Sequence, residues 1–394
     1  MNIILKNKYC WPLINNNVTD SDKKALADFI LNNDRFTNGP MVKEFEEEWS
    51  KWLGIKYSVM VNSGSMANYL SIAMLKEIRG FKGEIIVPPI GWVSDIASVL
   101  SHGFKPVFAD IDLRTLSLSA DSIKNAVNEH TLGIVLVHCL GFDAISDELM
   151  EIIKEKDLFF IEDCCESHGA KHESRKIGTF GDISCFSFFY GHHMTTIEGG
   201  MICTNDDNLY ELAKLYRSHG MTREAKSAIQ KSYVDNYPEL NPLFTFAVPG
   251  YNVRSTELNA VLGLEQIKRL DYNIEARKIN LDIWLSNLDS KLFFTDFNRL
   301  GNSNFALPLI LINKSETHFY NIQCLLEEED VEFRVGTAGG GNQALQPYLK
   351  NYKFKIADEL DNANHIHHFG LYVGNHPELE EKQILKLCSK LNEC

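Results

Sequence analysis

The sequence predicts an α/β protein in which a large domain, built on a mostly parallel sheet between helices, precedes a smaller α+β domain. Apolar runs of strand length alternate with amphipathic helical segments through the first 250 residues. This alternation is typical of a parallel sheet that helices cover on both faces. Near residue 250 the alternation gives way to a long helical stretch. The chain of 394 residues is long enough for two such domains.

The predicted elements of the large domain follow one another at short intervals. A strand over 58–61 leads through a Ser-Gly-Ser turn into a helix from residue 66 to about 78. The aliphatic runs that follow are short and lie between helical segments, so we expect them to be neighbouring strands of one sheet. In order, they are a strand over 84–87, a helix over 93–100, and strands over 107–109, 134–137 and 159–161.

The last third of the chain has a different pattern. A helical stretch runs from about 256 to 288, an apolar strand-like run covers 305–311, and a mixed remainder ends in a helix. We therefore predict an N-terminal arm over 1–30, a large domain over 31–255, and a connector helix with a small domain over 256–394.

Composition and charge exclude several classes of function. The apolar fraction is 44% and the charged fraction 23%, as in ordinary globular proteins. A net charge of −14 argues against a nucleic-acid surface, which needs an excess of Lys and Arg. We expect no signal peptide and no membrane span, since the start lacks a long apolar core. The nine cysteines are scattered without a C-x-x-C, which favours free thiols of a cytoplasmic protein and predicts no metal centre.

The most informative motif is the run Ser187–Gly200, which ends in Glu-Gly-Gly. It resembles the cofactor-lysine segment of the sugar aminotransferases that use pyridoxal phosphate, in which a lysine stands six residues before the Glu-Gly-Gly. Here that position is His192. A lysine amine can form a Schiff base with the cofactor aldehyde, whereas an imidazole cannot, although it carries protons near neutral pH. The chain is therefore similar to the small histidine branch of the family, the sugar 3-dehydratases. The resemblance implies the fold type I architecture of pyridoxal-phosphate enzymes, with a mostly parallel sheet of the seven-stranded type in the large domain.

Two segments are candidates for binding the cofactor phosphate. Gly64 and Ser65 lie between a strand and a helix, where free N–H groups at the helix start face an anion. A Ser-Gly-Ser turn that only caps a helix is common, so the turn alone is a weak signal. Its alignment with the Ser-Gly-Thr turn of the family, and Ser187 at the position of another phosphate ligand, favour a binding role.

Three further residues are candidates for contacts with the cofactor ring. Asp163 ends an apolar strand, and a carboxylate at that end of an open α/β sheet faces the ligand crevice. The resemblance implies that Asp163 pairs with the pyridine nitrogen, although a plain helix cap is the alternative. It also places Glu166 near a cofactor oxygen or the substrate. Trp92, which alone would suggest a core residue, matches the aromatic ring that stacks on the cofactor.

The pair His192–His193 allows three interpretations. Adjacent histidines could bind a metal, but neighbouring side chains point in different directions and no third ligand is evident. They could also be structural histidines. Because His192 replaces one specific lysine in an otherwise retained segment, we predict that it is the general acid and base.

Other candidates depend on the resemblance alone. Asn252 and Arg254 match family residues that reach the active site of the partner subunit, with the asparagine at the cofactor phosphate, which implies a homodimer with shared sites. His219 matches a motif near the substrate. Arg334 could hold a carboxylate or a sugar.

The resemblance implies a complete reaction. Pyridoxamine phosphate, held non-covalently, would condense with the ketone of a nucleotide-linked 4-keto-6-deoxy sugar, and loss of the C3 hydroxyl would give a 4-keto-3,6-dideoxy sugar for a surface polysaccharide such as O-antigen or capsule. L-glutamate would restore the amine. GDP is favoured over CDP because the CDP-linked relatives carry cysteines for an iron–sulfur centre. An ordinary sugar aminotransferase and a non-catalytic sugar-nucleotide-binding paralogue are the alternatives, and the missing lysine argues against the first.

Overall fold

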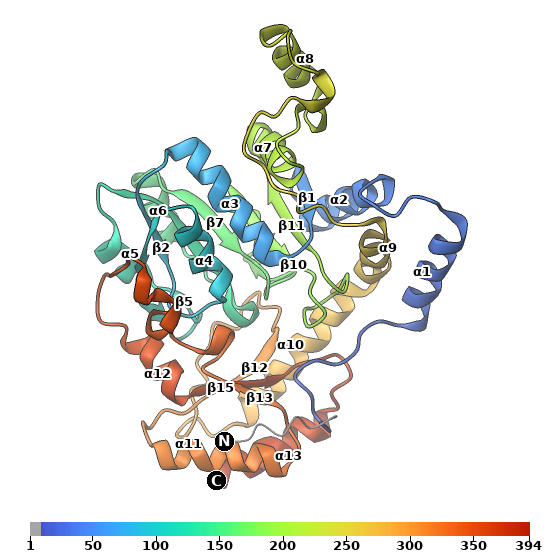
Figure 1. The fold of residues 1–394 in the computed structure, drawn as a ribbon. Helices are drawn as coiled ribbons and strands as arrows, with labels where there is room; N and C mark the ends of the chain where they lie inside the picture. Colours follow the sequence, from blue (N-terminus) through green and yellow to red (C-terminus); the bar gives the residue numbers. More distant parts are fainter. Residues whose placement is uncertain (1–8) are drawn as a thin grey trace.

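The computed structural model describes residues 9–394 and has a central eight-stranded sheet between helices (Figure 1). The strand order is β1-β11-β10-β7-β6-β2-β3-β14, and every adjacent pair is parallel except the two pairs that β11 makes. The strands are β1 (Tyr57–Val61), β2 (Glu84–Val87), β3 (Lys105–Phe108), β6 (Thr131–Val137), β7 (Phe159–Asp163), β10 (Ile183–Ser187), β11 (Gly200–Thr204) and β14 (Lys355–Ile356). The predicted α/β class is confirmed.

Side chains of the central strands alternate between two cores on opposite faces of the sheet. Ile85 and Val87 of β2 pack with α3 (Gly64–Arg79) and α4 (Val93–Ser101), whereas Ile86 packs with α5 (Ala120–Ala126) and α6 (Asp147–Glu155) on the other face. Both faces of a parallel strand are therefore apolar, which explains why these strands read as continuous aliphatic runs. A third cluster joins α2 (Pro40–Leu53) and α9 (Glu257–Gln266) to the β1–β11–β10 part of the sheet.

The sheet has one strand more than the seven-stranded type that the family resemblance implies. β14 has two residues and comes from the C-terminal part of the chain, where it pairs in parallel with β3. A strand of two residues carries no periodic signal, so the sequence could not indicate it. The other short strands are β4 (Ile111–Asp112), β5 (Ser117–Leu118), β8 (Lys171–His172) and β9 (Arg175–Lys176).

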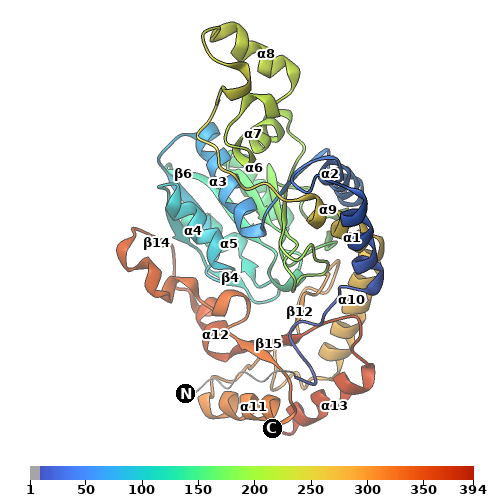
Figure 2. The ribbon, with the colours of Figure 1, turned by 45° about the vertical axis from the view of Figure 1, so that its right-hand side comes forward.

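A smaller antiparallel sheet in the order β12-β15-β13 forms the lower part of the molecule in Figure 2. Its strands are β12 (Ala306–Ile310), β13 (Phe333–Val335) and β15 (Gly370–Gly374). The helices of this region are α10 (Leu270–Asn287), α11 (Glu316–Glu328), α12 (Asp361–Phe369) and α13 (Glu381–Asn392). The domain boundaries stay a prediction, and β14 crosses from the predicted small domain to the large sheet.

The long helix predicted over 256–288 is divided in the structure. A 3-10 turn at Ile267–Arg269 separates α9 from α10. At this turn Arg269 forms an ion pair of 2.6 Å with the buried Asp22 of α1 (Asp20–Asn32), and Gln266 donates to the same carboxylate at 3.0 Å. The predicted helical stretch is present, but the sequence did not indicate the turn within it, because a contact with a residue 244 positions away leaves no local pattern.

The described part of the N-terminal arm crosses the small domain before it reaches α1. The buried Trp11 donates from Nε1 to the Gly374 carbonyl at 2.8 Å, and the Leu13 N–H donates to Glu332 at 2.9 Å. Residues 1–8 of the predicted arm lie outside the described residues. From residue 9 onward, the structure contains no helix that is both long and apolar enough to cross a membrane.

A segment after α7 (Asp207–Arg217) projects from the body of the molecule, with α8 (Ser227–Asn236) at its far end (Figure 1). Its return path exposes the apolar side chains of Leu243, Phe244 and Phe246, each more than half accessible.

Candidate active site

A cavity of about 340 Å³ opens at the carboxyl ends of the parallel strands, where the small domain meets the large sheet. Open α/β sheets bind ligands at this edge. Most of the residues that the sequence singles out line this cavity: Gly64, Ser65, Trp92, Asp163, Glu166, Ser187, His192 and Arg334.

The start of α3 forms one wall of the cavity and is suited to an anion. Ser63 caps the helix, with its Oγ accepting from the Met66 N–H at 3.2 Å, and Gly64 and Ser65 follow at the cavity surface. A Cβ on Gly64 would lie 2.5 Å from the Cβ of Ser187, so only glycine lets the Ser187 strand approach the helix this closely. The positive end of the helix and two serine hydroxyls therefore converge where a phosphate would fit.

Asp163, the last residue of β7, lies in the floor of the cavity and is held from two sides. Its Oδ1 accepts from the Cys165 N–H at 2.8 Å, and its Oδ2 accepts from the Asn68 side-chain amide at 2.6 Å. The same amide nitrogen of Asn68 donates to Asp95 Oδ1 at 2.7 Å. Asp163 is thus a fixed, almost fully buried acceptor for a protonated ring nitrogen.

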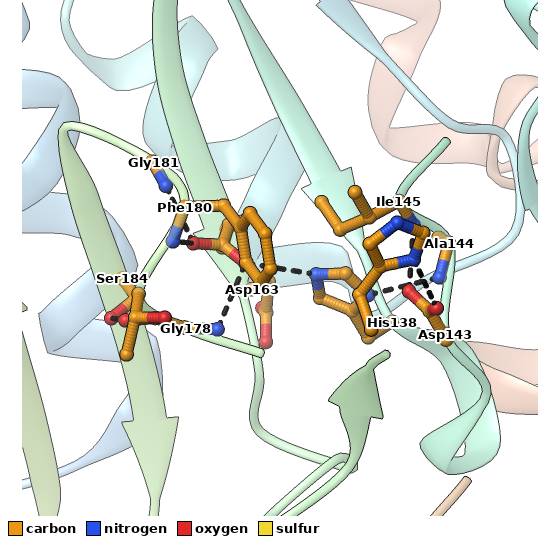
Figure 3. Close-up of polar contacts among 12 residues, drawn as sticks. His138, Asp143, Ala144, Ile145, Asp163, Gly178, Phe180, Gly181 and Ser184 are labelled. Carbon is orange, nitrogen blue, oxygen red and sulfur yellow. Dashed lines mark hydrogen bonds and ion pairs between the residues drawn. The ribbon is translucent and has the colours of Figure 1, made fainter. Parts of the chain in front are cut away.

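A buried polar network holds the end of β7 on the side away from this contact (Figure 3). Glu162 accepts hydrogen bonds from the backbone N–H groups of Gly178, Phe180 and Gly181 at 2.8, 2.8 and 2.6 Å. Its carboxylate lies 3.3 Å from the ring nitrogen Nε2 of His138. The backbone N–H of His138 donates to the backbone carbonyl of Asp163 at 3.0 Å. The network fixes the strand from which the Asp163 side chain projects.

The Glu162 network is also the place where a metal ion could be suspected. Within residues 9–394, the group of side chains whose ligand atoms all lie within 4.8 Å of one another is His138, Glu162 and Cys164. The three backbone N–H donors already occupy both Glu162 oxygens, and the buried Cys164 thiol has a pKa raised well above its usual value by burial. The network is therefore a structural hydrogen-bond cluster.

His192 lies in the loop after β10 and lines the cavity, with its ring 5.3 Å from that of Phe305. Its Nδ1 is buried and has no hydrogen-bond partner in the described structure. Burial lowers the pKa of His192 to about 4, although the Asp163 charge acts in the opposite direction. The imidazole is therefore neutral at pH 7 and can accept a proton.

The adjacent His193 has a different environment. It is fully buried, and its Nε2 lies 2.9 Å from the Ser303 carbonyl oxygen. It does not line the cavity. Of the two adjacent histidines, only His192 is placed to act on a bound molecule.

Glu166 contributes a second titratable group to the cavity. Its Oε2 accepts from the Leu140 N–H at 2.9 Å. Burial raises the pKa of Glu166 to about 7, with a further rise caused by Asp163, while the Leu140 N–H and the Arg334 charge oppose the rise. Near neutral pH this carboxyl can therefore either donate or accept a hydrogen bond.

The remaining walls carry an aromatic ring and a cation. Trp92 precedes α4 and is 51% exposed, so its ring is free to stack on a planar ligand. Arg334 of β13 donates to the Tyr372 hydroxyl at 3.3 Å. Three consecutive glycines at 339–341 lie against the turn that carries Trp92. Gly339 adopts φ +63°, and a Cβ there would lie 2.1 Å from the Gly91 carbonyl oxygen.

The structure does not bring three of the candidate residues to this cavity. Asn252 and His219 are exposed, and Arg254 is half-buried; none of them is among the lining residues. Asn252 pairs with Ser218 and Arg254 pairs with Val61 through isolated backbone bridges. Their assignment to cofactor or substrate stays a prediction.

Sequence reasoning missed several lining residues. Leu13 and Ile14 come from the N-terminal arm, and Phe305 and Tyr372 from the small domain. No local motif marks these residues, because their role depends on the packing of distant segments. Asn68 and Asp95 do not line the cavity but lie behind Asp163. They could have been noticed, since each is a polar residue on the buried face of a helix that directly follows a candidate motif.

The cavity fits pyridoxal phosphate on several independent observations. It combines a helix start with two hydroxyls for the phosphate, a buried carboxylate for the ring nitrogen, an exposed indole for the ring face and a neutral imidazole. No lysine is among the lining residues in the described chain.

Comparisons with known proteins agree with this arrangement. The model of the DegT/DnrJ/EryC1/StrS aminotransferase family matches residues 17–392. A GDP-4-keto-6-deoxy-D-mannose 3-dehydratase from Escherichia coli O55:H7 is 34% identical over 371 residues, which cover 93% of this chain and 95% of the relative. One from Yersinia pseudotuberculosis is 34% identical over 391 residues, with 97% and 98% covered. The crystal structure of GDP-4-keto-6-deoxymannose-3-dehydratase with a trapped PLP-glutamate geminal diamine is 34% identical, has a TM-score of 0.87, and covers 97% of this chain and 100% of its own.

The burial of His192 gives a testable pH dependence. In the cofactor-free protein, NMR titration of the His192 ring, assigned by comparison with His192→Asn, should have its midpoint near pH 4 instead of the usual 6.5. Because the unfolded chain binds this proton at a higher pH than the folded protein, stability should fall as the pH drops from about 6.5 towards 4. A midpoint at or above 6.5 would contradict the neutral-base assignment.

Proposed function

The chain belongs to the DegT/DnrJ/EryC1/StrS aminotransferase family, and on that premise we propose that it is a pyridoxamine-phosphate-dependent 3-dehydratase of a GDP-linked 4-keto-6-deoxy sugar. It removes the C3 hydroxyl to give a 4-keto-3,6-dideoxy sugar for a surface polysaccharide, and L-glutamate restores the amine of the cofactor. The observation that carries the proposal is His192, which stands in the place of the lysine in a cavity that is otherwise complete for the cofactor.

Each part of the cofactor has a residue to hold it. The start of α3, Ser65 and Ser187 bind the phosphate, Asp163 keeps the ring nitrogen protonated, and Trp92 covers the ring face. When bound, pyridoxamine phosphate supplies an amine that condenses with the C4 ketone and a protonated ring that stores electrons. Without a lysine the protein holds the cofactor through non-covalent contacts alone.

His192 moves the proton that the reaction requires. As a neutral imidazole it accepts a proton from the C4′ carbon of the cofactor, and as an imidazolium it donates that proton to the leaving oxygen of the C3 hydroxyl. With a pKa of about 4, the free group is neutral at pH 7 and so has a site for the proton, and the protonated group is a strong donor. Water then releases the amine as ammonia, and the keto sugar and the aldehyde form of the cofactor are the other products. The two water molecules set free by the condensation and by loss of the C3 hydroxyl balance the two that hydrolysis consumes.

The same residue distinguishes dehydration from transamination. In an ordinary sugar aminotransferase a lysine amine displaces the aminated product from the cofactor. An imidazole cannot do this, so release of a 4-amino sugar has no group to drive it here.

We also propose that the chain forms a homodimer in the cytoplasm. A homodimer would place the exposed Asn252 at the cofactor site of the partner subunit, and the exposed apolar side chains of Leu243, Phe244 and Phe246 offer surface that a second subunit could cover.

The mode of cofactor binding can be tested by reduction. After incubation with pyridoxal phosphate and borohydride, we expect no cofactor attached to the protein, and gel filtration should remove the cofactor, because His192 cannot form a Schiff base. The measurement is mass spectrometry of the intact chain and its peptides. A peptide with a reduced pyridoxyl-lysine would show that another lysine serves the cofactor.

Replacement of His192 by asparagine tests the proton carrier. His192→Asn keeps a polar side chain and should bind the cofactor, yet lose dehydration by roughly 10²–10⁴-fold, the usual contribution of a general acid or base. His193→Asn is the matched control, because it makes the same change one residue away and outside the cavity. Per folded molecule, as judged by thermal unfolding, this control should retain dehydration. Wild-type rates in His192→Asn would end the assignment of His192.

Shared sites can be tested by complementation. Asn252→Ala and His192→Asn should each be inactive as homodimers, whereas a mixture refolded together should regain activity, because a heterodimer contains one intact site. Activity is measured against the dimer fraction in ultracentrifugation. A monomer with full activity would exclude the shared arrangement.

A further inference from the structure

We propose, on the basis of the proposed cofactor function, that Asp95 is a positioning residue that keeps a proton against Asp163, so that the two carboxyls together carry one negative charge. No motif assigns a role to Asp95, and it does not line the cavity itself. It acts through Asp163, the group that faces the ring nitrogen.

The geometry places two carboxyls and one amide from three elements together. Asn68 of α3 donates through the same side-chain nitrogen to Asp163 Oδ2 at 2.6 Å and to Asp95 Oδ1 at 2.7 Å. Asp95 comes from the first turn of α4, which packs against α3. The three residues are 1–4% exposed, so water cannot separate their charges. An amide with two N–H groups therefore bridges two buried carboxyls.

A proton is needed to make this arrangement stable. One Asn68 nitrogen lies 2.6 Å from Asp163 Oδ2 and 2.7 Å from Asp95 Oδ1, so the two buried carboxyls are close neighbours, and a hydrogen bond between them requires a proton on one of them. Burial raises the pKa of Asp95 well above its usual range, and the Asp163 charge, this hydrogen bond and the Glu166 charge raise it further, while the Trp92 backbone N–H acts in the opposite direction.

The other groups around Asp95 do not remove the need for a proton. The titratable groups with which it interacts are Asp163, Glu166, Tyr348, Cys139, Cys165 and Cys185, and none of them is cationic at neutral pH. Each acid accepts one backbone N–H, Asp163 from Cys165 and Asp95 from Trp92, so their positions decide between them. Asp163 lines the cavity, where a protonated ring nitrogen favours its charged form, whereas Asp95 does not, and Asp95 is therefore the one that holds the proton.

The arrangement has a consequence for the cofactor. Asp163 must be ionised and correctly oriented to pair with a protonated ring nitrogen. A protonated Asp95 adds a hydrogen bond to that carboxylate without adding a second negative charge beside it. Asp95 therefore fixes both the charge and the orientation of the carboxylate, although it never touches the cofactor.

The first experiment does not depend on the cofactor. The infrared difference spectrum of cofactor-free wild type minus Asp95→Asn at pH 7 should contain the carbonyl stretch of one protonated carboxylic acid. Since a raised pKa stabilises the fold only at low pH, Asp95→Asn should also gain thermal stability relative to wild type as the pH rises above 3.8, the usual value of the group. Carboxylate bands in place of the acid band would overturn the proposal.

The second experiment uses pyridoxamine phosphate as the probe and measures its dissociation constant by fluorescence. Asp95→Asn keeps a neutral donor and should bind within about threefold of wild type, whereas Asp95→Ala loses the hydrogen bond to a charged group and should bind roughly 10–100-fold more weakly. Asp110→Asn is the matched control: it removes another buried acid, one that accepts from the Asn362 and Ala363 N–H groups away from the cavity, and its affinity should equal that of wild type.

Two results of the binding experiment would overturn the proposal. Asp95→Asn could bind as weakly as a folded Asp95→Ala, which would mean that a charge at position 95 is required. Asp95→Ala could bind as tightly as wild type, which would mean that Asp95 has no effect on Asp163. Failure of wild type itself to bind pyridoxamine phosphate would refute the proposed function instead, and the infrared result would still decide the protonation of Asp95.

Discussion

The contact that we propose between a protonated ring nitrogen and the carboxylate of Asp163 is the interaction on which the rest of the site depends. A buried carboxylate is costly unless donors surround it. Here β7 ends at the cavity, the Cys165 N–H and the Asn68 amide bind its two oxygens, and the His138 N–H binds its main-chain carbonyl. Below it, Glu162 ties the strand to the turn at 178–181. These contacts place one negative charge at a defined point of the cavity floor.

The buried environment of His192 explains how a histidine can stand where the family has a lysine. Burial keeps His192 neutral, and the Asp163 charge offsets this effect only in part. The imidazole can therefore accept a proton, provided that the cofactor is held by other contacts. In the proposed arrangement the helix start at Gly64, the Ser187 hydroxyl and the Trp92 ring, which all line the cavity, supply these contacts. In this proposal non-covalent contacts take the place of the covalent bond between the family's lysine and the cofactor. Elimination is favoured over amine transfer, because an imidazole cannot displace an aminated product from the cofactor.

The sequence predicted the parts of this protein that have local signals. Aliphatic runs with helices between them predicted the parallel sheet, and motifs of a few residues predicted Gly64, Asp163 and His192, which share one cavity. Features that depend on distant contacts were not predictable. β14 is too short to have a pattern, the break between α9 and α10 lies where Asp22 docks, and Leu13 and Ile14 reach the cavity from the N-terminal arm. Asn68 and Asp95 were predictable only in part. The sequence shows that each is a polar residue on an apolar helix face, but it does not show which residue each one contacts.

The most direct measurement of the central claim is a single turnover of the native protein loaded with pyridoxamine phosphate, given GDP-4-keto-6-deoxymannose without glutamate, with the products identified by mass. The account requires a 4-keto-3,6-dideoxy sugar and one equivalent of ammonia, because His192 can deliver a proton to the C3 hydroxyl but cannot displace an aminated product. A 4-amino sugar that still carries its C3 hydroxyl would contradict the account, since it would show that the protein transfers the amine as an ordinary aminotransferase does.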